Sequence, residues 1–94
     1  MVWRVIELKP ARKALDRAPD AIVKNWDAWL QIVRQSGPDG LRRIKGFHDE
    51  ALDGKWKGHR SSRLSRDYRI IYREHRDEVE VVVVDVTKHD YRKR

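Results

Sequence analysis

The side chains best suited to chemistry on a charged substrate lie in the second half of this 94-residue chain, and most of them are basic. From Gly54 to Arg73 there are seven basic residues and one acid, a difference of +6 within a total net charge of +7. The seven are Lys55, Lys57, Arg60, Arg63, Arg66, Arg69 and Arg73. Because a guanidinium group can bind two phosphate oxygens at once, this concentration of charge favours a polyanionic partner. A solvated basic face that only keeps a small protein soluble is the alternative.

These arginines are expected on β-strands. The stretch 68–72 is rich in aromatic and β-branched residues, and the polar stretch 65–67 before it is typical of a turn, which predicts an antiparallel hairpin. Side chains alternate along a strand, so Arg69 and Arg73 share one face and Tyr72 lies on the other. One face can therefore be packed while the other presents arginines on a rigid platform, with a histidine and a tyrosine near the chain's end.

The remaining patterns predict the elements that position this hairpin. Strands are expected at 2–8, 60–65, 68–75 and 78–86, and amphipathic helices at 11–18 and 20–35. The fold class is therefore α+β, a single domain over residues 1–94. Two N-terminal helices pack on a small, mainly antiparallel four-stranded sheet in the order β-α-α-β-β-β. Trp26 and Trp29 have helical spacing, which predicts core packing and not base stacking. Residues 39–54 are expected to form a surface connector with solvated acids.

Composition excludes several classes of protein. The chain has no cysteine, and no apolar run approaches the roughly 20 residues of a membrane span, so we expect a cytoplasmic protein without membrane contact. His48, His59 and His75 do not have the spacing of a metal-binding pair on a helix. We therefore expect neither a metal site nor a cofactor.

The motifs from Glu50 to Tyr91 resemble those of the RelE superfamily of type II toxins, and within it the YoeB branch. The matching motifs are Asp49-Glu50-Ala51-Leu52, Gly54, Gly58, Ser62-Arg63-Leu64, Tyr68-Arg69-Ile70-Ile71-Tyr72 and Lys88-His89-Asp90-Tyr91. The chain departs from YoeB in placing Asp90 between His89 and Tyr91 and in adding three basic residues after them. The resemblance implies a RelE-like fold and a toxin that cleaves messenger RNA on the ribosome. It also implies an antitoxin protein as partner.

The resemblance also implies a role for each matching residue. Glu50 falls at the general base, Arg69 at the phosphate-stabilising arginine and His89 at the general acid. Arg63 lines the site and Tyr91 is the terminal aromatic. Contacts with messenger and ribosomal RNA are expected from Lys55, Lys57, Arg60, Arg66, Arg73, Lys88, Arg92 and Lys93.

Simpler readings of these residues stay open. Arg69 could form a cross-strand ion pair with Asp67 or Glu80, and His89 could be a chain terminus without chemistry. The same fold also serves ParE-like toxins that inhibit DNA gyrase and cut no RNA. A non-catalytic RNA-binding protein is a further alternative.

Overall fold

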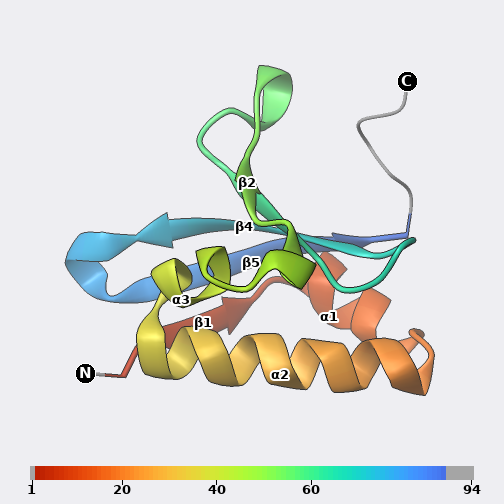
Figure 1. The fold of residues 1–94 in the computed structure, drawn as a ribbon. Helices are drawn as coiled ribbons and strands as arrows, with labels where there is room; N and C mark the ends of the chain where they lie inside the picture. The colour runs from red at the N-terminus through yellow and green to blue at the C-terminus, as the bar shows by residue number, and fades with distance from the viewer. Residues whose placement is uncertain (1, 89–94) are drawn as a thin grey trace.

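The computed structural model describes residues 2–88 and shows a five-stranded mixed sheet with its helices on one side (Figure 1). The strands are β1 (Arg4–Glu7), β2 (Glu50–Ala51), β3 (Arg60–Arg63), β4 (Arg69–His75) and β5 (Glu80–Thr87). Their order in the sheet is β1-β5-β4-β3-β2, and all neighbours are antiparallel except β1 and β5. The N-terminal strand thus lies beside the C-terminal one, as expected for a strand that joins the same sheet.

The helices and short turns connect these strands. The α-helices are α1 (Lys9–Asp16), α2 (Asp20–Ser36) and α3 (Pro38–Arg42), and the 3₁₀ turns are η1 (Lys45–Phe47), η2 (Gly54–Trp56) and η3 (Arg76–Glu78). Helices α1 and α2 lie beneath the sheet in Figure 1, whereas the β2–η2 segment rises from its other side. Within residues 2–88, no helix combines the length and apolarity that crossing a bilayer requires. The α+β class with two N-terminal helices on a sheet is confirmed.

The predicted strand number is wrong by one. Strand β2 lies in the segment 39–54, which was expected to be an irregular connector, and pairs with β3 through Glu50 opposite Ser61 and Ala51 opposite Arg60. A strand of two residues is too short to show the alternation by which strands are recognised in a sequence. The sheet therefore has one more edge strand than predicted, and that strand carries Glu50.

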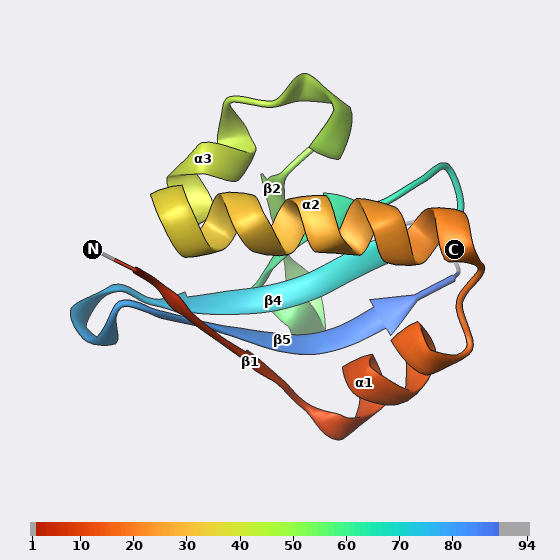
Figure 2. The ribbon, with the colours of Figure 1, turned by 90° about the horizontal axis from the view of Figure 1, so that it is seen from below.

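Helix α2 lies across the sheet (Figure 2), and its buried residues Ile22, Trp26, Trp29 and Val33 belong to the core cluster. Trp26 and Trp29 are 4% and 0% exposed, and their rings stack with centroids 5.3 Å apart. Trp29 also meets the ring of Tyr72 on β4 edge to face at 5.5 Å. Core packing of both tryptophans is therefore confirmed.

The end of α2 is fixed by Gly37, whose φ of +72° favours glycine. A Cβ atom at this position would lie 2.6 Å from Nε1 of Trp3, so the close approach of the N-terminal segment also requires glycine. The contact joins the end of α2 to the segment before β1.

The two faces of β4 have different surroundings. Ile70 and Tyr72 belong to the core cluster that packs with α2. Because side chains alternate, Arg69, Ile71 and Arg73 lie on the opposite face, which α1 and α2 do not cover. This second face is called the helix-free face below.

Candidate functional site

Four strands bring polar side chains into neighbouring rows on the helix-free face. Arg63 on β3 lies opposite Arg69 on β4, and Arg69 lies opposite Thr87 on β5. One row away, Ser61 on β3 lies opposite Glu50 on β2. Directly paired residues have their side chains on the same face of a sheet, so Glu50, Arg63 and Arg69 share this face.

Arg69 and Glu50 are in direct contact. The Nη2 atom of Arg69 donates to Oε2 of Glu50 at 3.2 Å and to Oγ of Ser61 at 2.9 Å. The Arg69 side chain is 2% exposed and the Glu50 side chain 38% exposed. The site thus has a guanidinium held at its floor and a carboxylate that solvent reaches above it.

The surroundings of Arg69 differ from those expected in both its exposure and its ion pairing. The arginine platform is not open at Arg69, because that side chain is buried and hydrogen-bonded to its neighbours. The cross-strand ion pair of Arg69 with Asp67 or Glu80 does not form among the described residues: Arg69 pairs with Glu50, and Glu80 pairs with Arg4. Strand β2 is the element that makes this pairing possible, and it was not predicted.

Arg63 and Arg73 differ from Arg69 because no carboxylate of the described residues balances their charge. Each side chain is half-buried, and its Nε atom is buried without a hydrogen-bond partner. Within residues 2–88, neither guanidinium makes an ion pair. A buried donor without a partner is costly, so a polyanion on this face would gain two charged ligands that no carboxylate of the described chain neutralises. They lie about 13 Å apart along the sheet, since Arg63 is opposite Arg69 and Arg73 follows four residues later on β4.

A second polar cluster lies on the helix side, directly beneath β2. The side chain of Asp49 is 0% exposed and accepts hydrogen bonds from Arg60 Nε (2.8 Å), Ser62 Oγ (2.7 Å) and Tyr72 Oη (2.6 Å). Burial, together with the nearby charge of Asp49, raises the pKa of the Tyr72 hydroxyl. The expectation that the acids of this segment are solvated is therefore wrong for Asp49.

Asp49 and Glu50 are neighbours in the chain that serve opposite faces of the sheet. Asp49 binds residues that face α2, whereas Glu50 binds Ser61 and Arg69 on the helix-free face. The buried carboxylate therefore fixes the backbone from which Glu50 extends. Sequence reasoning missed this role of Asp49, and the only signal for it was the adjacency of the two acids.

The other predicted RNA contacts fall into three groups. The first group is exposed and has no ion pair within the described chain: Lys55, Lys57, Arg66 and Lys88. Arg60 instead pairs with Asp49; the carboxylate raises the pKa of Arg60, although burial acts in the opposite direction. The third group, Arg92 and Lys93, lies outside the described residues, as do His89 and Tyr91, the predicted general acid and terminal aromatic. Strand β5 ends at Thr87, opposite Arg69, two residues before His89.

Comparison with known proteins gives structural matches only. No protein-family model matches the chain, and neither does any curated protein sequence. The archaeal RelE of a RelE–RelB complex from Pyrococcus horikoshii OT3 is similar with a TM-score of 0.75 at 25% identity, covering 96% of this chain and 98% of that one. YafQ from E. coli strain BL21(DE3) is similar with a TM-score of 0.75 at 16% identity, with coverage of 98% and 99%.

A third similar structure comes from the branch suggested by the sequence motifs. It is a chain of the YoeB–YefM toxin–antitoxin complex from Staphylococcus aureus, with a TM-score of 0.72 at 14% identity and coverage of 95% and 99%. At these identities the likeness of YafQ and YoeB concerns the fold. The structural likeness confirms the resemblance: this chain has the fold of the RelE-superfamily type II toxins.

Proposed function

We propose that this protein is the toxin of a type II toxin–antitoxin system and that it cleaves messenger RNA on the ribosome. The observation that carries the proposal is the convergence of Glu50, Arg63 and Arg69 on one sheet face. The structural likeness to RelE, YafQ and YoeB supports it, since all three are toxin chains with this fold. The excess of basic residues on the same hairpin suits a substrate of repeated phosphates.

The proposed chemistry is a transfer of the phosphodiester to the neighbouring 2′-oxygen. Glu50 accepts the proton of the ribose 2′-hydroxyl, and the 2′-oxygen then forms a bond to phosphorus. Arg69 and Arg63 stabilise the charge that builds up on the phosphorane oxygens. The bond from phosphorus to the 5′-oxygen breaks, and His89 gives that oxygen a proton. The products are a 2′,3′-cyclic phosphate and a 5′-hydroxyl, and Tyr91 would stack on a base or bind the phosphate.

The surroundings of the described residues support these proposed roles. The Glu50 carboxylate is held by Arg69 but is partly exposed, so a ribose can approach it. Arg69 is held in turn by Ser61, so the charge at the floor of the site has a defined position before substrate binds. The partnerless Nε of Arg63 lies opposite Arg69 in the same row.

An antitoxin partner is part of the proposal. The similar RelE and YoeB chains were each solved as complexes, with RelB and YefM respectively. A segment with acidic side chains would be drawn to the basic hairpin of this chain, and by covering Arg63 and Arg73 it would keep RNA away. Ribosomal RNA would be held by the exposed lysines of the β2–β3 connection, Lys55 and Lys57.

The test is primer extension on a message being translated in vitro, with wild type and the variants Glu50→Gln, Arg63→Gln and His89→Gln. Arg63 is partly exposed, so its replacement leaves the core intact, whereas Glu50→Gln removes the carboxylate that pairs with the buried Arg69. The unfolding midpoint of each variant is therefore measured beside its cleavage, so that loss of activity is separated from loss of the fold. Arg34→Gln is the control, since it removes an exposed arginine from α2, which lies on the other side of the sheet and carries no predicted RNA contact. We expect cleavage by wild type and Arg34→Gln and strongly reduced cleavage by the other three. Intact message with wild type, together with stalled replication and an SOS response in cells, would replace the proposal with a ParE-like inhibitor of gyrase.

A further inference from the structure

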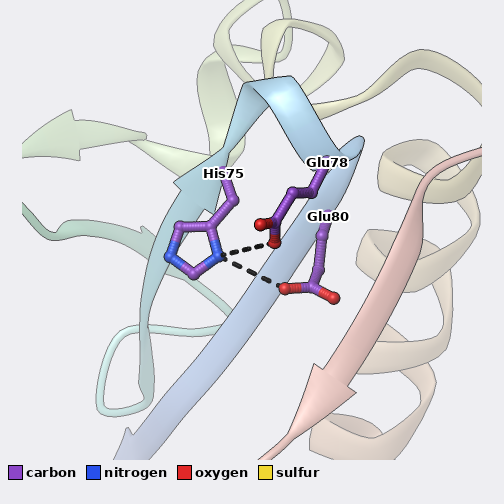
Figure 3. Close-up of side chains that lie close together, drawn as sticks. All are labelled: His75, Glu78 and Glu80. Atoms are coloured by element: carbon purple, nitrogen blue, oxygen red, sulfur yellow. Dashed lines mark hydrogen bonds and ion pairs between the residues drawn. The ribbon is translucent and has the colours of Figure 1, made fainter.

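A histidine and two glutamates converge at the turn between β4 and β5, away from the site described above (Figure 3). His75 ends β4, Glu78 belongs to η3 and Glu80 begins β5. One ligating atom from each lies within 4.8 Å of the others. Figure 3 shows both carboxylates directed toward the same ring nitrogen, Nδ1 of His75.

We propose that His75, Glu78 and Glu80 form a binding site for a divalent first-row transition metal such as Zn²⁺. Zinc binds imidazole nitrogen and carboxylate oxygen at about 2.0–2.2 Å, which for a tetrahedral ion places ligand atoms about 3.4 Å apart. The Nδ1 atom of His75 is 3.2 Å from Oε1 of Glu80 and 3.8 Å from Oε1 of Glu78. All three ligand atoms lie within 4.8 Å of one another, so movements of about an ångström in the exposed Glu78 and His75 side chains would bring them into coordinating positions.

The surrounding residues orient one of the three ligands and leave the other two accessible to solvent. The side chain of Glu80 is 9% exposed, and its other oxygen, Oε2, accepts a hydrogen bond from Nη2 of Arg4 at 2.8 Å. This contact orients the carboxylate and leaves Oε1 for the ion, as partners behind metal ligands do in zinc sites. Glu78 is 65% exposed and His75 40% exposed, so an ion and its water ligands can reach the open side.

The charge balance also suits a dication. Two carboxylates and a neutral imidazole carry two negative charges, and Arg4 offsets one of them. Arg76, which lies in the turn itself, is already paired with Asp39 and Glu74. In the metal-free protein, Nδ1 of His75 lies within hydrogen-bonding distance of Oε1 of Glu80, at 3.2 Å. A metal ion bound through Nδ1 would take the place of a proton on that nitrogen.

The ligands come from two strands joined by a tight turn, which is why histidine spacing in the sequence gave no sign of them. His75 and Glu80 are cross-strand partners, and Glu78 is three residues from His75. His75 lies six residues along β4 from Arg69, or about 20 Å at 3.3 Å per residue. Metal here would tie the β4–β5 turn together without touching Glu50 or Arg69, so the inference is independent of the proposed function.

The experiment is titration of untagged protein with Zn²⁺, followed by calorimetry and by thermal unfolding, with Co²⁺ absorption as a report of coordination. Glu78→Gln removes one exposed ligand, and His75→Gln removes the ring nitrogen. Asp77→Asn is the matched control, because it removes the same charge from an exposed neighbour in the same turn. Zn²⁺ at a hundredfold excess over its Kd should raise the wild-type Tm by about 10 °C.

The variants decide the outcome. Loss of one ligand should weaken Zn²⁺ binding at least about tenfold in Glu78→Gln and His75→Gln, whereas Asp77→Asn should bind like wild type. Equal binding in all four proteins would mean that Zn²⁺ sits elsewhere and would overturn the proposal. No measurable heat or Tm shift with wild type would also overturn it, and the cluster would then be only a hydrogen-bonded brace of the turn.

Discussion

Replacing Asp49 by asparagine tests whether the buried carboxylate beneath β2 holds the site in place. The side chain is fully buried and accepts bonds from Arg60, Ser62 and Tyr72 at 2.6–2.8 Å. Asparagine keeps the size but turns one acceptor oxygen into a donor that faces other donors. Breaking a buried, hydrogen-bonded charge pair from one side costs about 3–5 kcal/mol. For a domain of this length, that loss corresponds to a Tm lower by roughly 15–25 °C.

The assay is urea unfolding followed by tryptophan fluorescence, which reports the packed pair Trp26 and Trp29. Asp53→Asn is the control, because Asp53 is an exposed acid of the same segment, and its loss should change the free energy of unfolding by less than about 0.5 kcal/mol. A double-mutant cycle of Asp49→Asn with Tyr72→Phe should show coupling of about 1 kcal/mol or more. A cost below about 1 kcal/mol for Asp49→Asn would refute the idea that this carboxylate organises the segment before Glu50.

Three further predictions concern single residues. The pKa of Tyr72 is raised from its model-compound value of 10.0, so above that pH the unfolded state ionises while the folded state stays neutral. The stability contributed by Tyr72 is therefore complete below pH 10 and is lost as the pH rises further. If the unfolding midpoint of Tyr72→Phe fell as steeply above pH 10 as that of the wild type, this prediction would be contradicted. Gly37→Ala should lower the free energy of unfolding by about 1–3 kcal/mol, because the added Cβ atom meets Trp3 and the backbone has a positive φ. Gly46→Ala is the control and should be nearly neutral, because a Cβ atom there would have no atom within 4 Å. Equal losses of stability in thermal melts of the two variants would refute this reason. Val79 has a φ of +51°, which strains a β-branched residue, so Val79→Asn should stabilise the protein by roughly 1 kcal/mol, and a lower Tm would contradict that.

The fold was largely predictable because its longer elements have clear periodicity. Helix α2 repeats apolar residues at the spacing of one helix face, and β5 contains a run of valines suited to a central strand. Strand β2 was not predictable, since two residues show no period. Its position depends on the buried bonds of Asp49, which no local pattern records.

The residues of the candidate site were predictable, but their burial and hydrogen bonding were not. Alternation along one strand separates Arg69 from Tyr72, and the motif resemblance adds Arg63 and Glu50, whose position beside Arg69 follows from the register of β2, β3 and β4. Burial of Arg69 could not be foreseen, because it depends on Glu50 and Ser61 arriving from other strands. The grouping of His75 with Glu80 likewise arises from strand register, which a sequence does not state.

The most direct test of the account is the single-turnover cleavage rate of a ribosome-bound message, measured for wild type and for Glu50→Gln on ribose and 2′-deoxy substrates. If Glu50 takes the 2′-hydroxyl proton above Arg69, the variant should cleave about 10²–10⁴-fold more slowly, and the 2′-deoxy substrate should stay intact with both proteins. Cleavage by Glu50→Gln at the wild-type rate, or cleavage of the 2′-deoxy message, would contradict it.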